Sequence, residues 1–102
     1  MSSLAELQAE IVAERASRGF TSDPGRLLAL LVEEVGEVAR ELTKTWSPND
    51  DDFEVERLAC ELADVLVLVC ALASAHGVDL DHSVRHKFFE VDADRTWKSA
   101  PK

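Results

Sequence analysis

The chain has 102 residues, two cysteines and a formal net charge of −9. This length is that of one small domain, so we expect a single domain over residues 1–102 that gains stability from a partner subunit. Twenty acidic against eleven basic side chains repel nucleic-acid polymers and anionic membrane surfaces. The composition therefore excludes nucleic-acid polymers and membranes as partners. The negative charge indicates either cation binding or solubility alone.

The cysteines and the apolar runs indicate a cytoplasmic protein. Cys60 and Cys70 lie on one expected helix, about 15 Å apart along its axis, so they cannot pair with each other and we expect reduced core thiols. The N-terminus lacks the basic and apolar regions of a secretory signal. The longest apolar run, Val65 to Ala73, is too short to span a membrane.

The hydrophobic pattern predicts an all-α fold of four helices, because apolar residues recur at helical spacing and no strand-like alternation is present. Ser2 or Ser3 can cap the first helix, Asp23 before Pro24 marks the second, and Gly77 ends the third. The expected helices span about residues 3–17, 24–44, 53–76 and 80–97.

Carboxylates line the second expected helix. Residues 33–37 read EEVGE, and a turn of about 100° per residue places Glu34, Glu37 and Glu41 along one edge of the apolar face, while Glu33 points away. Glutamates at this spacing are common on solvated helix faces. Taken alone, the motif is an ordinary charged helix surface.

The third expected helix makes a metal site the better interpretation. Glu61 and Asp64 sit at i,i+3, and Asp64 heads the apolar run, so we expect it to be buried and in need of a cation. A short loop makes the two helices antiparallel, which brings Glu34 and Glu37 to the depth of Glu61 and Asp64. Four carboxylates suit Mg²⁺, or Mn²⁺. An Arg57–Glu61 ion pair is the alternative, and it leaves Asp64 without a partner.

EEVGE followed by ELAD resembles the MazG-like all-α nucleoside triphosphate pyrophosphohydrolases, and the resemblance covers nearly the whole chain. It implies a four-to-five-helix bundle completed by oligomerisation, as a homodimer or homotetramer. It also implies that Glu33 orients or deprotonates the attacking water. The metal ligands it implies are Glu34, Glu37, Glu61 and Asp64.

The same resemblance places substrate contacts elsewhere in the chain. Lys87 and Arg95 match the basic residues expected to bind phosphate, although Asp92 stands where the family carries asparagine. The base pocket is expected on the first helix and the turns, which makes Gln8, Phe20 and Trp46 candidates. A solvated helix end and ordinary core packing are the structural alternatives for these positions.

We therefore expect a magnesium-dependent enzyme that cleaves a nucleoside triphosphate between its α- and β-phosphates, in cleansing of the nucleotide pool. Two alternatives stay open at this point. The first is phosphoribosyl-ATP pyrophosphohydrolysis with the same metal motif. The second is a metal-binding or dimerisation module without catalysis.

Overall fold

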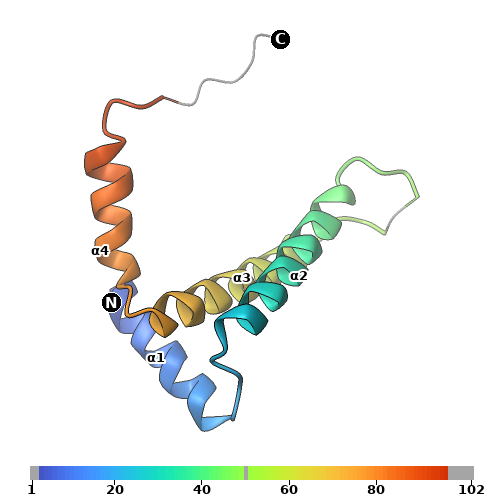
Figure 1. Cartoon of the computed structure of the whole chain (residues 1–102). Coiled ribbons are helices and arrows are strands. Elements are labelled where there is room, and N and C mark those ends of the chain that lie inside the picture. Colours follow the sequence, from blue (N-terminus) through green and yellow to red (C-terminus); the bar gives the residue numbers. More distant parts are fainter. Residues whose placement is uncertain (1–2, 50, 97–102) are drawn as a thin grey trace.

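The computed structural model describes residues 3–49 and 51–96. Within those ranges the chain is all helical and has no strand, which confirms the predicted fold class (Figure 1). The elements are α1 (Leu4–Ser17), α2 (Pro24–Thr43), α3 (Val55–Ala75), α4 (Leu80–Val84) and the π-helical segment η1 (Arg85–Val91).

Side-chain caps set the helix starts as the sequence predicts. Ser3 Oγ accepts from the Glu6 N–H at 3.1 Å, and Asp23 caps α2 by accepting from the Arg26 N–H at 2.9 Å. Gly77 follows α3 with φ +67°, a left-handed conformation that favours glycine. Local hydrogen bonds therefore account for these boundaries.

The last helix differs from the prediction of one regular helix reaching about residue 97. The α-helical part ends at Val84 and the wider η1 coil continues only to Val91. Asp92 closes η1, because its N–H donates to Lys87 O at 2.9 Å and its carboxylate accepts from Lys87 Nζ at 2.5 Å. Trp97, the predicted end of the helix, lies outside the described residues.

The core lies between α2 and α3, which run antiparallel as a hairpin with α1 crossing α3 (Figure 1). Leu27 is fully buried against Leu68 and Ala71, and Leu31 and Leu72 pack around them. This small cluster fixes α2 against α3 and so decides which carboxylates of the two helices meet.

Gln8 ties α1 to the far end of α3. Its amide nitrogen donates to Ser74 Oγ at 2.8 Å and to Val78 O at 2.7 Å, while its Oε1 accepts from the Leu80 N–H at 3.0 Å. The side chain is buried at 6% exposure. These contacts hold the turn between α3 and α4, and they make Gln8 a structural bridge in this chain.

Much of α3 is exposed in the single chain, so the expectation that Asp64 is buried is wrong there. Leu62 is 50% and Leu66 39% exposed, and Asp64 is also exposed, although α1 and α2 pack against this helix. Of the two free thiols, Cys70 is buried and Cys60 is exposed, so only Cys70 is the predicted core residue.

By length and composition α3 could cross a membrane, because it has 21 residues and an 18-residue stretch with a mean hydropathy of 2.1. The prediction concerned the unbroken apolar run, Val65 to Ala73, which is still too short to span a membrane. Core helices of soluble proteins have the same composition, and α3 carries Glu61 and Asp64 opposite α2. Those carboxylates are costly in hydrocarbon and favour the core-helix interpretation.

We expect Gln8→Ala to lower the free energy of unfolding by about 2–4 kcal/mol. It removes three hydrogen bonds and leaves their partly buried partners, Ser74 Oγ, Val78 O and the Leu80 N–H, without the Gln8 side chain. Gln8→Glu keeps the acceptor for the Leu80 N–H but sets a buried carboxylate oxygen against Val78 O, so at neutral pH its loss should be at least as large. Urea unfolding at one protein concentration measures both. The exposed neighbour Glu6 is the matched control, and Glu6→Gln should change little. An unchanged Gln8→Ala midpoint would contradict the structural role.

Candidate metal and nucleotide site

Three carboxylates from two helices meet beside the hairpin core. Glu34 comes from α2, and Glu61 and Asp64 come from adjacent turns of α3. Each offers an oxygen, and these oxygens all lie within 4.8 Å of one another. The i,i+3 spacing on α3 and the antiparallel packing produce this grouping, as the sequence predicts.

The cluster raises the pKa of Glu34. Burial of its carboxyl is the largest cause, followed by a hydrogen bond with the Glu61 side chain and then by the negative charges of Asp64, Glu61 and Glu37. All of these causes disfavour the ionised form of Glu34. A cation among the oxygens would reverse the effect, because it stabilises the ionised carboxylates.

The donor set fits a hard divalent cation. All three side chains of the group offer carboxylate oxygen, the ligand type preferred by Mg²⁺ and Mn²⁺. Asp64 is exposed, so water or a substrate oxygen can reach the same position. These residues can therefore hold a metal and still leave coordination positions open.

The other predicted carboxylates lie outside this group. Glu37 is exposed one turn along α2 and acts on Glu34 through its charge, so the structure brings together three of the four predicted ligands. Glu33 is exposed too, as its position on the helix predicts. Their roles as a metal ligand and a water-activating residue remain predictions.

Two ion pairs explain nearby charges that belong to no site. Glu41 is 7% exposed, and both of its oxygens lie 3.0 Å from Lys44 Nζ, which accounts for its burial. Arg57 pairs with Glu54 at 3.4 Å, so the alternative pairing of Arg57 with Glu61 is not formed. Glu61 is therefore left to the carboxylate cluster.

A cavity of about 720 Å³ opens beside the cluster, between α1, α2 and α3. Glu34 and Asp64 line one part of it, and Phe20 and Thr21, from the turn between α1 and α2, line another. Leu30, Leu68 and other apolar side chains form its walls. The volume is within the usual range for a small-molecule site.

Among the three predicted base contacts, only Phe20 lines this cavity. Gln8 is occupied by its three hydrogen bonds at the α3–α4 turn. Trp46 follows the C-terminal end of α2 and is 74% exposed. The structure therefore brings Phe20 into the same space as the carboxylates, and leaves the other two candidates apart from it.

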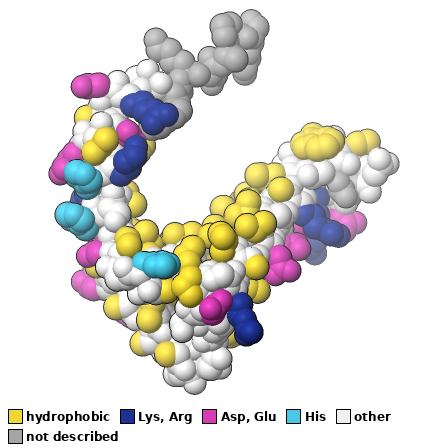
Figure 2. All heavy atoms as spheres, in the orientation of Figure 1, with side chains coloured by type: hydrophobic (Ala, Val, Ile, Leu, Met, Phe, Trp, Pro, Cys, Tyr) yellow, Lys and Arg dark blue, Asp and Glu magenta, His cyan; other side chains and the backbone are white. Residues whose placement is uncertain are grey.

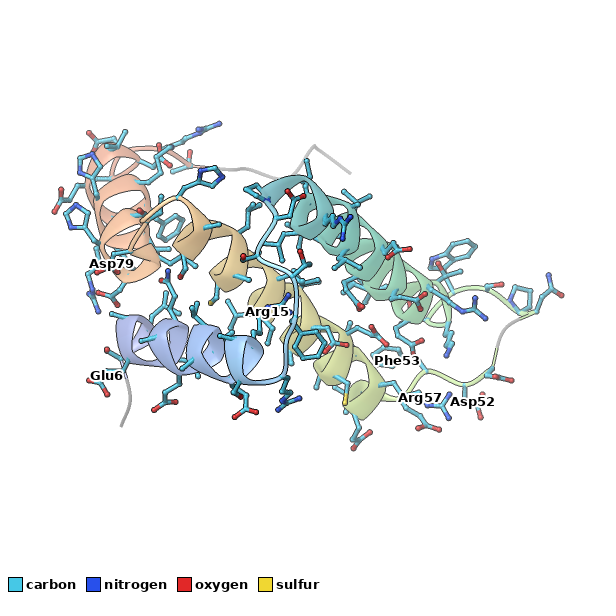
Figure 3. The ribbon with its side chains drawn as sticks, turned by 60° about the horizontal axis from the view of Figure 1, so that its bottom comes forward. Glu6, Arg15, Asp52, Phe53, Arg57 and Asp79 are labelled. Atoms are coloured by element: carbon cyan, nitrogen blue, oxygen red, sulfur yellow. The ribbon has the colours of Figure 1, made fainter. Side chains whose placement is uncertain are left out.

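Sequence reasoning missed Arg15 and Arg18, which line the same cavity from the end of α1. The Arg15 guanidinium lies over the Phe20 ring at 5.0 Å and donates to Thr21 O at 3.1 Å. Figure 3 shows Arg15 between α1 and α3, beside the turn that leads to α2. The available signal was a basic pair at i,i+3 just before Gly19 and Phe20.

The predicted phosphate contacts lie on a separate arm. Lys87 belongs to η1 and Arg95 follows it, and this arm leads away from the α2–α3 hairpin (Figure 1). Asp92 accepts from Lys87 Nζ at 2.5 Å and lies 4.0 Å from Arg95. Within one chain, therefore, these cations are not brought to the carboxylate cluster, and their role remains a prediction.

Comparison with known proteins points to one family. Residues 22–90 match the model of the MazG nucleotide pyrophosphohydrolase domain. The chain is 35% identical over 97 residues to a dATP/dGTP diphosphohydrolase of Cyanophage S-2L, covering 95% of this chain and 80% of that protein. It is 33% identical over 100 residues to the uncharacterized protein YpjD of Bacillus subtilis (strain 168), covering 88% and 86%. No solved structure gives a significant match.

Cation binding and pH should act on the same carboxylates. Because the pKa of Glu34 is raised above 4.5, protonation stabilises the fold; this contribution is complete below pH 4.5 and is lost as pH rises through the raised value. In chelator we expect the melting temperature to fall over that window. Mg²⁺ should raise it more at pH 8 than at pH 5, as thermal melts can measure.

Glu34→Gln provides the matching variant for this prediction. It removes the repulsion, so in chelator at pH 8 it should melt above the wild type and respond little to Mg²⁺. Glu56→Gln, an exposed change on the same hairpin, should keep the wild-type response. A Mg²⁺ response that survives Glu34→Gln would show that the cation binds elsewhere.

Proposed function

The chain belongs to the MazG nucleotide pyrophosphohydrolase family, and on that premise we propose that it hydrolyses nucleoside triphosphates to the monophosphate and pyrophosphate with magnesium. The observation that carries the proposal is the group formed by Glu34, Glu61 and Asp64, of which Glu34 and Asp64 line a cavity of about 720 Å³. Mn²⁺ is an alternative cation with the same ligand preference.

In the reaction, a water oxygen forms a bond to the α-phosphorus. The bond between the α-phosphorus and the oxygen that bridges it to the β-phosphate breaks. Pyrophosphate leaves with the bridging oxygen, and the water proton passes to a base. When bound, a divalent cation supplies charge neutralisation of phosphoryl oxygens. Glu34, Glu61 and Asp64 would hold this cation, and so would determine where the α-phosphate lies.

Glu33 is the proposed acceptor of the water proton, by its match to the family motif. In the single chain its side chain is exposed on α2 and does not line the cavity. The role therefore requires a second copy to complete the space on that side of α2. This links the proposed chemistry to the oligomeric state.

Purine deoxynucleotides are the proposed substrates, because the phage relative is named a dATP/dGTP diphosphohydrolase and aligns over nearly the whole chain. Removal of unwanted triphosphates from the cytoplasmic nucleotide pool is the role we propose.

A second copy is the proposed partner. The radius of gyration is 16.4 Å, against about 13 Å for a compact chain of this size. Apolar side chains gather along the concave side between the arm and the hairpin (Figure 2). Exposed large apolar side chains include Leu62 and Leu66 on α3 and Phe89 and Val91 on η1. We infer a homodimer or homotetramer in which the arm of one copy covers the hairpin of another.

Asp64→Asn should abolish pyrophosphate release while leaving the helical circular dichroism intact, because Asp64 is exposed and contributes its charge to the cluster. The assay uses dATP, dGTP, pyrimidine triphosphates and phosphoribosyl-ATP, with Mg²⁺ and with chelator. We expect a loss of at least about 100-fold in kcat, as for other groups that stabilise transition-state charge.

Three outcomes would count against the proposal. Turnover that ignores chelator would remove the metal from the mechanism. Selective turnover of phosphoribosyl-ATP would change the substrate class. An absence of turnover with every nucleotide, by a folded wild type, would favour a binding module.

Subunit complementation tests whether Lys87 reaches the cluster of another copy. Asp64→Asn and Lys87→Ala should each be nearly inactive, and co-refolding the two should restore part of the activity. A mixed pair would contain one site with both the intact carboxylates and an intact Lys87. Light scattering should give a multiple of 11.3 kDa. A monomer, or mixing without recovery, would contradict action across copies; Glu90→Gln, an exposed change on η1, is the control variant.

A further inference from the structure

Arg15 is held rigidly at the end of the cavity that lies toward the α1–α2 turn. Its guanidinium lies 5.0 Å from the centre of the Phe20 ring and donates to Thr21 O at 3.1 Å. The side chain is half-buried, and Phe20 and Thr21 line the cavity beside it. A ring contact and a backbone acceptor fix the fork of N–H donors and reduce the entropy lost on binding.

The end of the cavity at Arg15 is separated from the carboxylate cluster by about half the length of α2. Glu34 lies ten residues after Pro24, about 15 Å along the axis at 1.5 Å per residue. The turn with Phe20 and Thr21 precedes Pro24 directly. A nucleotide whose α-phosphate lies at Glu34 therefore extends its base, and not its phosphates, toward Arg15.

The surroundings of Arg15 also favour a base over a phosphate. Glu10 and Glu14 line the same cavity from α1, and the Arg18 guanidinium is paired with Glu14 at 2.6 Å. These two carboxylates balance the guanidinium groups of Arg15 and Arg18, so this end offers a phosphate group no net positive charge. The apolar walls, Leu30 and Val67 among them, suit an aromatic ring.

We propose that Arg15 is a specificity-determining residue that reads the O6 and N7 acceptors of a guanine-type purine, so that the preferred substrate is a 6-oxopurine nucleotide. Arginine matches this pair of acceptors with two N–H donors, whereas adenine presents a donor at the corresponding position. The inference rests on the proposed function, since it requires a nucleotide in this cavity. Phe20 contributes as the surface that orients the guanidinium.

The test compares four nucleotides that differ at the acceptors. The substrates are dGTP, dITP, 7-deaza-dGTP and dATP; dITP keeps both acceptors, 7-deaza-dGTP lacks N7, and dATP lacks O6. Initial rates of pyrophosphate release with Mg²⁺ give kcat/KM for the wild type, Arg15→Ala and Arg15→Lys. Arg26→Ala is the matched control, because Arg26 is an exposed arginine that does not line the cavity.

For the wild type we expect dGTP and dITP to be preferred over dATP. Arg15→Ala should lower kcat/KM about 10- to 100-fold for dGTP and dITP, mainly through KM, and change dATP little. Arg15→Lys keeps the charge but not the fork, so it should lose most of the preference as well. Replacing dGTP by 7-deaza-dGTP should lower kcat/KM by a smaller factor in Arg15→Ala than in the wild type.

Other outcomes would overturn the inference without touching the proposed function. Equal losses for all four nucleotides would make Arg15 a phosphate contact, and unchanged constants would leave it a packing residue. A preserved Mg²⁺-dependent rise in melting temperature shows that each variant keeps the fold and the metal site. Failure of the wild type to turn over any nucleotide would instead contradict the proposed function itself.

Discussion

Repulsion among Glu34, Glu61 and Asp64 is the constraint on which the site depends. The antiparallel packing of α2 on α3, fixed by Leu27 against Leu68, holds their oxygens within 4.8 Å of one another. Burial, a hydrogen bond with Glu61 and this repulsion together raise the pKa of Glu34. The packing of the hairpin thus keeps the three carboxylates close together despite their repulsion. A bound cation would remove this repulsion, which favours cation binding.

The hydrophobic core of the α2–α3 hairpin is small, and the arm formed by α4 and η1 does not pack against it. Only a few side chains are fully buried, while Leu62 on α3 and Phe89 on η1 remain half-exposed or more. Gln8 then sets the direction of the arm, by hydrogen bonds to both sides of the α3–α4 turn. The arm is therefore held away from its own hairpin, with its apolar side chains available to another copy.

Features determined by local contacts were predictable from the sequence. The caps at Ser3 and Asp23 and the i,i+3 grouping of Glu61 and Asp64 each depend on neighbours a few residues away. The exposure of Asp64 was not, because an apolar sequence around a carboxylate does not reveal how many helices cover it. The α4–η1 arm also depends on distant contacts: Gln8 reaches Leu80 across 72 residues. Arg15 escaped notice because its partner is a turn carbonyl.

The distribution of charge also gives an order to binding. The chain carries −9 overall, and Glu34 and Asp64 repel a free triphosphate where they line the cavity, whereas Glu10 and Glu14 beside α1 are balanced by Arg15 and Arg18. A cation at the carboxylate cluster removes the repulsion where the phosphates must lie, and no net positive charge beside α1 competes for them. On the proposed function, the triphosphate has only one favourable direction in the cavity, which carries its base to Arg15. Metal binding would then precede base recognition, because the bound cation fixes the position of the phosphates and so directs the base to the Arg15 guanidinium.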